Sequence, residues 1–442
     1  MTAVDFQPAG TGPGSGSSPA GPVEVEVVVA TADRQRILGR RDGDAPAPPR
    51  LRLGSSWPPP SSQLPGAVAA ATGVAVALVE PLDATLFVAE PLGGEPTGGY
   101  AWFDAGAFGP GAVRDWLDRP TTGPRPPWYR PGWYARAVDW FDAALAGQGI
   151  RRTGPAAQIR HWTTSCVLCA PTTAGRVFLK AGLAHLAHEP RLIDHLARTW
   201  PDAVPRVLAS SPEDGWWLSA DFGAQPPVRD APGALRTLAR IQAGTVGRTA
   251  PLAELGCPTL TLADLAGRVP ALLRQPRLWQ PAGEPDRARL TRVGMWLQDR
   301  CAELDDFDLP ESLVHGDLHQ HNAADGAAGP LLFDWSFAAV SHPLLDLGGW
   351  LHAVAEPDAR RHVAAYLEGW RHLAPPDVLR EAWLAARPVA ALFELVKFAD
   401  LADRMGPAYE FDYLPMAYLW ARRVQDAFAG RGADLTGWPD HQ

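Results

Sequence analysis

Lysine is almost absent from this sequence: of 40 lysine and arginine residues, only Lys180 and Lys397 are lysines. Arginine therefore occupies almost every position at which any positively charged side chain would be sufficient. The basic residues form no block, and the net charge of −9 argues against nucleic acid or an anionic membrane as the main partner. The same acidic balance permits a cationic substrate.

Cysteine is also scarce, and the four cysteines show no disulfide framework. Cys166 and Cys169 have Cys-x-x-Cys spacing, but no second pair exists, so core packing is expected rather than metal or redox chemistry. No apolar run approaches the length of about 18 residues that a membrane helix needs. The N-terminus lacks a basic region before an apolar stretch. The sequence thus predicts a soluble, cytoplasmic protein.

What the sequence does contain is the run His-Gly-Asp-Leu-His-Gln-His-Asn at residues 315–322, followed by a short apolar segment that ends in Asp334. In phosphoryl transfer from ATP, an Asp receives the proton of the acceptor hydroxyl and an Asn five residues later holds one Mg²⁺. A further Asp after the next strand holds the metal that bridges the phosphates. These roles fall to Asp317, Asn322 and Asp334. The apolar residues 329–333 predict a buried strand that delivers Asp334.

The His-Gly-Asp triplet, the Asn five residues after its Asp, and the later Asp-Trp pair resemble the aminoglycoside phosphotransferase and choline kinase-like family, which shares the protein-kinase fold. Gly316 stands where protein kinases carry the arginine that pairs with a phosphorylated activation loop. Too little chain separates Asp334 from the next expected structural carboxylate, Asp346, for a segment that cradles a protein substrate.

The resemblance covers roughly the last two-thirds of the chain. It implies a small-molecule kinase that uses ATP and Mg²⁺ and phosphorylates a hydroxyl of an aminoglycoside-like antibiotic or similar metabolite. The alternative is a non-catalytic, kinase-like regulatory or nucleotide-binding protein.

Lys180 ends an apolar strand pattern at residues 175–181. A kinase places there the ammonium that grips the α- and β-phosphates, a point charge that arginine replaces poorly. A surface lysine at a strand end is the alternative. Glu189 opens a helix with proline in its first turn, and is the candidate partner of Lys180, although a first-turn Glu also favours the helix dipole by itself. Arginine is expected to be tolerated at Lys397.

Two further segments are expected, from the resemblance, to contact the nucleotide. Residues 158–169 predict two strands around a Thr/Ser turn, where Thr164 and Ser165 are candidates for phosphate contacts or are ordinary turn formers. Residues 216–223 resemble the hinge at which adenine meets backbone, and the candidates there are Ser219, Ala220 and Asp221. The Asp-Phe-Gly within this segment precedes the catalytic loop, so it is not the metal-binding motif.

Upstream, residues 23–125 predict a separate small α/β domain. A strand is expected at 23–30, its hairpin partner at 36–40, another strand at 84–89, and a helix ending in Thr-Gly at 64–74. This order resembles a Nudix domain. The helix has no glutamates to hold Mg²⁺ around a diphosphate, which implies a degenerate, non-hydrolytic module. A generic α/β domain is the alternative.

An aromatic helix at residues 126–150 is expected to dock this domain on the kinase lobe, with Trp133, Ala137, Trp140 and Phe141 on one face. The predicted fold class is α+β: a protein-kinase-like two-lobed fold preceded by a small α/β domain. The expected parts are a disordered tail (1–22), the α/β domain (23–125), the connector (126–150), a small antiparallel-sheet lobe (151–224), a helical lobe (225–430) and a tail (431–442).

The acceptor site of this family lies in the helical lobe and is often lined by carboxylates when the substrate is cationic. The candidates are Glu394, Asp400, Asp403, Glu410 and Asp412. A solvated helix face is the alternative. Fold-level analogy does not select among aminoglycosides, other antibiotics, amino alcohols, sugars and homoserine-like metabolites.

Overall fold

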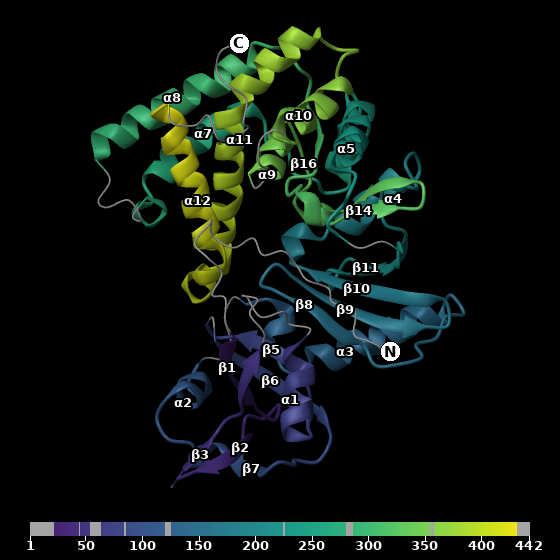
Figure 1. The fold of residues 1–442 in the computed structure, drawn as a ribbon, viewed down its shortest axis with the longest axis vertical. Helices are drawn as coiled ribbons and strands as arrows, with labels where there is room; N and C mark the ends of the chain where they lie inside the picture. Colours follow the sequence, from purple (N-terminus) through teal and green to yellow (C-terminus); the bar gives the residue numbers. More distant parts are fainter. Residues whose placement is uncertain are drawn as a thin grey trace. The chain divides into compact units, whose positions relative to one another are not determined.

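The chain divides into two compact units (Figure 1): Met1–Ala184 with Leu208–Ala220, and His185–Val207 with Asp221–Gln442. The computed structural model describes residues 22–43, 45–53, 63–83, 85–119, 125–223, 226–279, 286–352, 354 and 358–430. The two predicted tails therefore lie outside the described residues, apart from residue 22. Among the residues described, no helix combines the length and apolar character that a membrane crossing requires.

The first part of unit 1 is a four-stranded mixed sheet in the order β4-β1-β6-β5. β1 is parallel to β6 and antiparallel to β4, and β5 is antiparallel to β6. Successive side chains of β1 point to opposite faces. Val27 therefore packs with residues of α1, whereas Val28 packs with residues of α2, so this strand is apolar on both faces. The elements are β1 (Val23–Val29), β4 (Arg50–Leu53), α1 (Leu64–Thr72), β5 (Ala75–Pro81), β6 (Leu86–Gly93) and α2 (Ala112–Leu117).

The hairpin predicted between the first two strands is confirmed at one antiparallel bridge only, which joins Ala30 to Ile37. After this bridge β2 enters a separate three-stranded sheet in the order β3-β2-β7. β1 itself pairs with β4 and β6, so its contact with β2 is limited to the end of the strand. The other predictions here, strands at 23–30 and 84–89 and a helix at 64–74, are confirmed, although Ala84 is not among the described residues. The second sheet consists of β2 (Arg36–Asp42), β3 (Ala45–Ala47) and β7 (Tyr100–Asp104).

The second part of unit 1 is a five-stranded sheet in the order β11-β12-β10-β9-β8. β10 pairs antiparallel with β12 and β9, and β8 pairs antiparallel with β9. The two strands predicted around a Thr/Ser turn are confirmed as β8 and β9. The strands are β8 (Ala157–His161), β9 (Ser165–Thr172), β10 (Gly175–Gly182), β11 (Val207–Ser211) and β12 (Trp216–Ala220).

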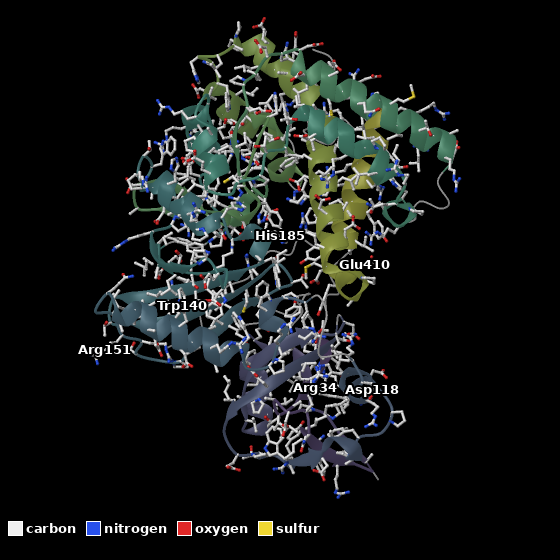
Figure 2. The ribbon with its side chains drawn as sticks, turned by 180° about the vertical axis from the view of Figure 1, so that it is seen from behind. Arg34, Asp118, Trp140, Arg151, His185 and Glu410 are labelled. Carbon is white, nitrogen blue, oxygen red and sulfur yellow. The ribbon has the colours of Figure 1, made fainter. Side chains whose placement is uncertain are left out.

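The aromatic connector forms the short η2 turn (Pro127–Tyr129) and α3 (Trp133–Ala146). The buried face of α3 repeats every four residues and consists of Trp133, Ala137, Phe141 and Leu145. Trp140, which was predicted on this face, is half-buried beside it, with its ring 5.7 Å from that of Trp216 on β12 (Figure 2). The amide of Gly132 donates to Glu90 of β6 at 2.5 Å. The connector thus contacts the four-stranded and the five-stranded sheets of unit 1.

A glutamine side chain joins these sheets directly. Gln158 of β8 accepts from the backbone N–H of Leu78 on β5 at 2.6 Å through Oε1 and donates to the carbonyl of Leu78 at 3.1 Å through Nε2. Both β5 and β8 are edge strands, and Gln158 is buried. The amide therefore replaces the pair of hydrogen bonds that a neighbouring strand would make.

We expect Gln158→Leu to lower the melting temperature of the full chain, because two buried backbone groups of Leu78 lose their partner while side-chain volume is retained. At about 1–3 kcal/mol for each of the two unsatisfied groups, the loss is about 2–6 kcal/mol. Gln148→Leu is the matched control, since Gln148 is exposed. Equal shifts of the melting temperature in the two variants would contradict the role of Gln158.

Unit 2 is mainly helical and is organised around α11, which packs against α7, α8, α9 and α12. Two short antiparallel pairs, β13 with β16 and β14 with β15, complete the unit. The predicted α+β fold class is therefore confirmed. The main elements are α4 (Glu189–Ala197), α5 (Ala231–Thr245), α6 (Ala250–Glu254), α7 (Leu262–Leu273), α8 (Arg287–Asp305), β13 (Ser312–Val314), β14 (Ala323–Gly326), β15 (Gly329–Leu332), β16 (Ala339–Ser341), α9 (Asp346–Leu351), α10 (Asp358–Glu368), α11 (Pro376–Met405) and α12 (Glu410–Phe428).

His342, between β16 and α9, makes unit 2 sensitive to acid. Its side chain is buried, and neither ring nitrogen has a hydrogen-bond partner among the described residues. Burial lowers the pKa of His342 from 6.5 to about 3. The unfolded chain therefore takes up a proton between these values that the folded chain does not, so the stabilising effect of neutral His342 is present above pH 6.5 and is lost as the pH falls.

We expect the melting temperature of the wild type to fall more between pH 7 and pH 5 than that of His342→Leu. As the pH falls, the free energy of unfolding of the wild type should decrease by up to about 1.4 kcal/mol per pH unit more than that of the variant, because one more proton is bound on unfolding. The exposed residue His372 provides a control, because His372→Leu should retain the wild-type dependence. Parallel curves for wild type and His342→Leu would contradict the assignment.

Candidate active site

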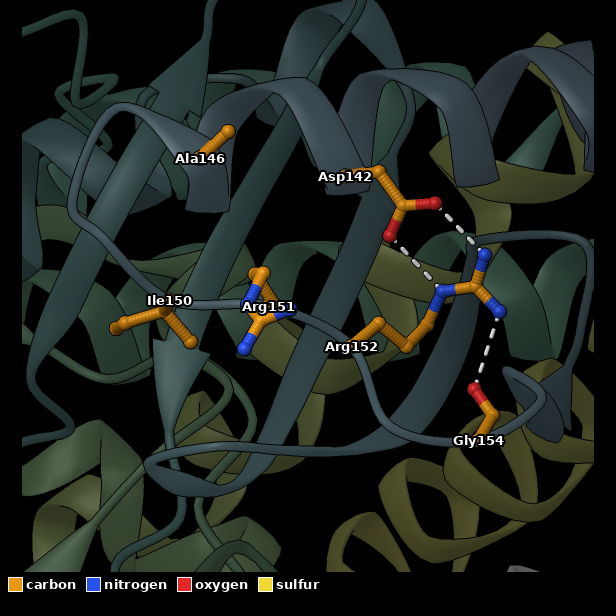
Figure 3. A pocket seen from close by; sticks show the side chains of 6 residues that line it. All are labelled: Asp142, Ala146, Ile150, Arg151, Arg152 and Gly154. Atoms are coloured by element: carbon orange, nitrogen blue, oxygen red, sulfur yellow. Dashed lines mark hydrogen bonds and ion pairs between the residues drawn. The ribbon is translucent and has the colours of Figure 1, made fainter.

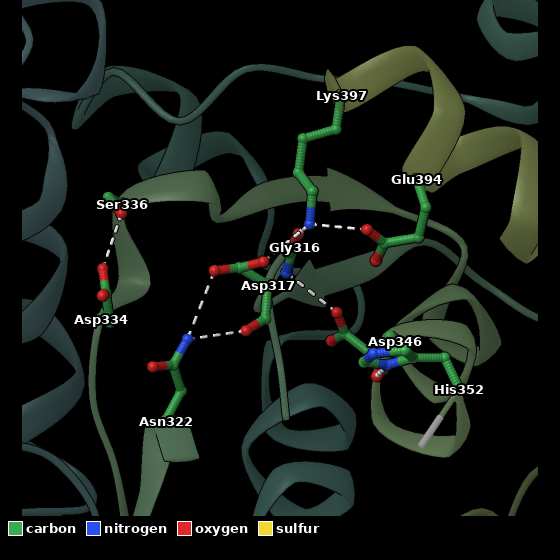
Figure 4. Close-up of polar contacts among 10 residues, drawn as sticks. Gly316, Asp317, Asn322, Asp334, Ser336, Asp346, His352, Glu394 and Lys397 are labelled. Atoms are coloured by element: carbon green, nitrogen blue, oxygen red, sulfur yellow. Dashed lines mark hydrogen bonds and ion pairs between the residues drawn. The ribbon is translucent and has the colours of Figure 1, made fainter. Parts of the chain in front are cut away.

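Two of the predicted site residues lie together in the loop between β13 and β14 (Figure 4). A short helical turn, Gln320–Asn322, brings Asn322 back over Asp317. The side-chain Nδ2 of Asn322 donates to the backbone carbonyl of Asp317 at 2.8 Å and contacts its Oδ2 at 3.4 Å. These bonds direct the amide nitrogen toward Asp317, which leaves Oδ1 of Asn322 as the atom it can offer to a metal.

Asp334 joins this cluster from the end of β15, the buried strand predicted at residues 329–333. The amide of Phe333 donates to the carbonyl of Asn322 at 3.0 Å, which fastens the strand end to the loop. Asp334 has φ 67° and ψ 55°, a left-handed conformation that is uncommon outside glycine and gathers at functional sites. Ser336 Oγ donates to its Oδ1 at 2.8 Å. Asp317, Asn322 and Asp334 therefore lie together in unit 2 as a group of two carboxylates and one amide, which we call the Asp317 cluster.

The backbone of the loop is fixed by Asp346 at the start of α9. Its carboxylate accepts from the amides of His315 at 2.7 Å and Gly316 at 2.8 Å, and from Gln242 at 2.8 Å. The prediction of a structural carboxylate at this position is confirmed. Burial raises the pKa of Asp346 to about 7 in spite of the two backbone bonds. Gly316 has φ 77°, and a Cβ there would collide with the carbonyl of Phe337, which explains the glycine of the triplet.

Two histidines of the loop, His315 and His319, are held neutral by burial. His315 is fully buried, its Nε2–H donates to the carbonyl of Phe333 at 3.0 Å, and its ring lies 4.5 Å from that of Trp335. Burial lowers the pKa of His315 to about 4. Burial likewise lowers the pKa of His319 to about 4, and its Nδ1 accepts from the amide of His321. His315 thus connects the loop to the strand that carries Asp334.

Lys397 of α11 is a site residue that the sequence interpretation missed. Its Nζ lies 2.8 Å from Asp317 Oδ1, 2.9 Å from the carbonyl of Gly316 and 2.7 Å from Glu394 Oε2 (Figure 4). Burial raises the pKa of Asp317, but Lys397 and then His319 outweigh it and leave this pKa below its ordinary value. Burial opposes the charge of Lys397, yet Asp317 and Glu394 raise its pKa. The scarcity of lysine was the available signal, because Lys397 is one of only two lysines in the chain and contacts Asp317.

The predicted nucleotide-binding residues fall in both units. Lys180 is buried on β10, the central strand of the five-stranded sheet, opposite Val167 and Trp217, so the alternative of a surface lysine is wrong. Thr164 lies half-buried in the turn before β9. The remaining candidates of unit 1 are Ser165 at the start of β9, and Ser219 and Ala220 on β12. Glu189 and Asp221 belong to unit 2, so their pairing with this set stays a prediction.

Four of the five acidic residues proposed for a cationic acceptor are already ion-paired. Asp400 pairs with Arg268, and Arg277 pairs with both Asp403 and Glu410. Glu394 is buried against Lys397. Asp412 lies half-buried in the first turn of α12. The four paired carboxylates have their charge compensated within the protein, which removes the main support for an acidic acceptor site and for the solvated-face alternative at Glu394.

Asn322 and Asp334 fit Mg²⁺ by their donor chemistry, since Mg²⁺ takes one or two protein oxygens and completes its shell with water and phosphates. The described residues contain no group of three or more His, Cys, Asp or Glu side chains that could hold a metal. The four cysteines all lie in the described part of the chain and form no disulfide. Cys166 is buried in the sheet, in agreement with the predicted packing role.

A surface hollow occurs elsewhere, between α3 and β8 of unit 1 (Figure 3). It is lined by Asp142, Ala146, Ile150, Arg151, Arg152 and Gly154. Arg152 donates to both oxygens of Asp142, at 2.9 and 2.7 Å, and to the carbonyl of Gly154 at 3.0 Å. The hollow contains none of the predicted site residues, and its ion pair is satisfied within the protein.

The chain is similar to known proteins. Residues 172–389 match the family described as APH, phosphotransferase enzyme family. A curated N-acetylmuramate/N-acetylglucosamine kinase of Caulobacter vibrioides is 27% identical over 268 residues, covering 54% of this chain and 70% of that protein. The range matched by the family, residues 172–389, includes both Lys180 and the Asp317 cluster.

Two solved structures are also similar. One is a choline/ethanolamine kinase family protein from Mesorhizobium loti, with 18% identity, 68% of this chain and 100% of that chain covered, and a TM-score of 0.48. The other is a macrolide 2′-phosphotransferase from Brachybacterium faecium, with 20% identity, 64% and 98% covered, and a TM-score of 0.47.

Proposed function

We propose that this chain, whose residues 172–389 belong to the phosphotransferase enzyme family, transfers the γ-phosphoryl group of ATP to a hydroxyl of a small molecule. The observation that supports this most is the assembly of Asp317, Asn322 and Asp334 from a loop and the following strand end. The required groups are present at one place, which favours a catalyst over a kinase-like protein that only binds nucleotide.

In the proposed reaction the acceptor oxygen forms a bond to the γ-phosphorus while the bond to the ADP oxygen breaks. The hydroxyl proton goes to the carboxylate of Asp317, which is ionised because its pKa lies below the ordinary value. Asn322 and Asp334 would hold Mg²⁺, which neutralises charge on the phosphates. Lys180 would bind the α- and β-phosphates, together with backbone and hydroxyl groups near Thr164, Ser165, Ser219 and Ala220.

For the acceptor we propose a neutral, sugar-like hydroxyl compound before a polycationic one. The candidate carboxylates are compensated by arginine or lysine, and the curated relative is named as a kinase of two N-acetylated amino sugars. The test is ADP formation by the full chain with MgATP and a panel of acceptors: N-acetylated sugars, simple sugars, an aminoglycoside, a macrolide and choline. Turnover only with aminoglycoside or choline would refute the acceptor class. Binding of MgATP without turnover on any hydroxyl compound would favour the regulatory alternative.

We expect Lys180→Arg to lower kcat/KM for MgATP by about tenfold or more, even though it keeps the charge. Lys180 is buried on a central strand, so the planar guanidinium cannot occupy the position of a compact ammonium. Arg176, on the same strand and half-buried, is a control position, and Arg176→Lys should have little effect. Wild-type kcat/KM in Lys180→Arg would remove Lys180 from the phosphate site.

A further inference from the structure

The ammonium of Lys397 has three protons and three oxygen partners. Asp317 Oδ1, the carbonyl of Gly316 and Glu394 Oε2 lie 2.7–2.9 Å from Nζ. The rings of Phe398 and Phe337 lie 4.9 and 5.5 Å away. Only 8% of the Lys397 side chain is exposed, against 27% for Asp317. With its donors engaged by protein, Lys397 has none left for a substrate, whereas Asp317 remains accessible.

This arrangement restricts Asp317 at one oxygen. The charged hydrogen bond holds Oδ1, while the only contact of Oδ2 within the described part of the chain is the one with Asn322 at 3.4 Å. An adjacent ammonium makes a carboxylate a weaker base, so this pairing does not serve to strengthen proton acceptance. Phosphoryl transfer instead depends mainly on placing the acceptor oxygen in line. An oriented carboxylate serves that purpose even when its basicity is reduced.

Glu394, on the same helix as Lys397, is the third oxygen partner of the ammonium. It lies one turn before Lys397, is 4% exposed, and binds the ammonium on the side away from Asp317. A buried ion pair of this kind contributes little net stability. It does hold the lysine in one rotamer, and it offsets the cost of burying the ammonium. α11 is thereby connected to the catalytic loop by charge as well as by packing.

We propose that Lys397 is a positioning residue, which locks Asp317 Oδ1 and the Gly316 carbonyl to α11 and so presents Oδ2 of Asp317 to the acceptor hydroxyl. This inference rests on the proposed phosphotransferase function. It replaces the expectation that arginine is tolerated at this position, because a planar guanidinium cannot meet three oxygens clustered around one nitrogen.

The test compares Lys397→Met, Lys397→Arg and the control Glu381→Gln in the full chain. Glu381 lies on the same helix, α11, and is exposed. We expect kcat to fall about 10- to 100-fold in Lys397→Met and Lys397→Arg, with affinity for MgATP within about twofold of wild type. Glu381→Gln should keep kcat. Full activity in Lys397→Met, or full rescue by arginine, would overturn the proposal.

A double variant isolates the route through Asp317. If Lys397 acts by orienting this carboxylate, adding Lys397→Met to the Asp317→Asn variant should lower kcat little further. Multiplying losses would indicate a separate, structural effect and would overturn the inference. A crystal structure of Lys397→Gln gives a readout that does not depend on turnover: the Asp317 carboxylate should rotate while Asn322 and Asp334 stay in place. An unmoved Asp317 would refute the proposal even if no acceptor is found, whereas absence of turnover in the wild type bears on the proposed function alone.

Discussion

Asp317→Asn is expected to lower kcat by about two to four orders of magnitude while leaving the affinity for MgATP nearly unchanged. The amide retains the size of the carboxylate and can still accept from Lys397, so the loop between β13 and β14 should keep its shape. What it loses is the ability to take the proton of the acceptor hydroxyl and to hold that hydroxyl with a full charge. Steady-state kinetics with the best acceptor, together with nucleotide binding measured without acceptor, separate these effects.

Asp325→Asn is the matched control for this variant. Asp325 lies on β14, only a few residues beyond Asn322, and its carboxylate accepts from the amides of Arg229 and Asp230 at 3.0 and 3.2 Å. It should therefore affect stability more than kcat. If Asp317→Asn weakens MgATP binding as much as it lowers kcat, Asp317 belongs to the nucleotide site rather than the acceptor site.

The grouping of Asp317, Asn322 and Asp334 could be predicted because these residues are close in sequence. Asp317 and Asn322 share one loop, and the apolar strand before Asp334 determines where that residue emerges. Lys397 was missed for the opposite reason. It reaches Asp317 from 80 positions away, through the packing of α11, and a helix pattern does not specify which face meets a distant loop.

Long-range packing also accounts for the errors. The partners of the acidic candidates are arginines of α7 and of the turn after it, 132 positions from Asp400 in the case of Arg268. No local pattern around Asp400 indicates that its charge is compensated. The hairpin predicted at residues 36–40 is limited to one bridge for a similar reason, because β1 pairs mainly with β4 and β6, strands that follow later in the chain. Local alternation predicts a strand but not its neighbours.

Replacement of Asp334 is the second change that is expected to have a large effect on activity. Its replacement should weaken binding of MgATP by at least about tenfold and lower kcat/KM by about 100-fold or more, because one of the two proposed oxygen ligands of Mg²⁺ is removed. Affinity for ATP measured without Mg²⁺ should change little. This pattern is the reverse of that expected for Asp317→Asn, in which binding is kept and turnover is lost.

The choice of substitution matters, because Asp334 is left-handed at φ 67°. Alanine at such a position adds backbone strain of roughly 1–2 kcal/mol, whereas asparagine adopts the conformation readily. Asp334→Ala should therefore lower both the melting temperature and MgATP affinity, while Asp334→Asn should lower mainly the affinity. Ser336→Ala serves as the control, since it removes the 2.8 Å hydrogen bond to Asp334 but no proposed metal ligand. If Asp334→Asn binds MgATP as tightly as wild type, the carboxylate is not a metal ligand, and the role of Asp334 is confined to the strained turn that follows β15.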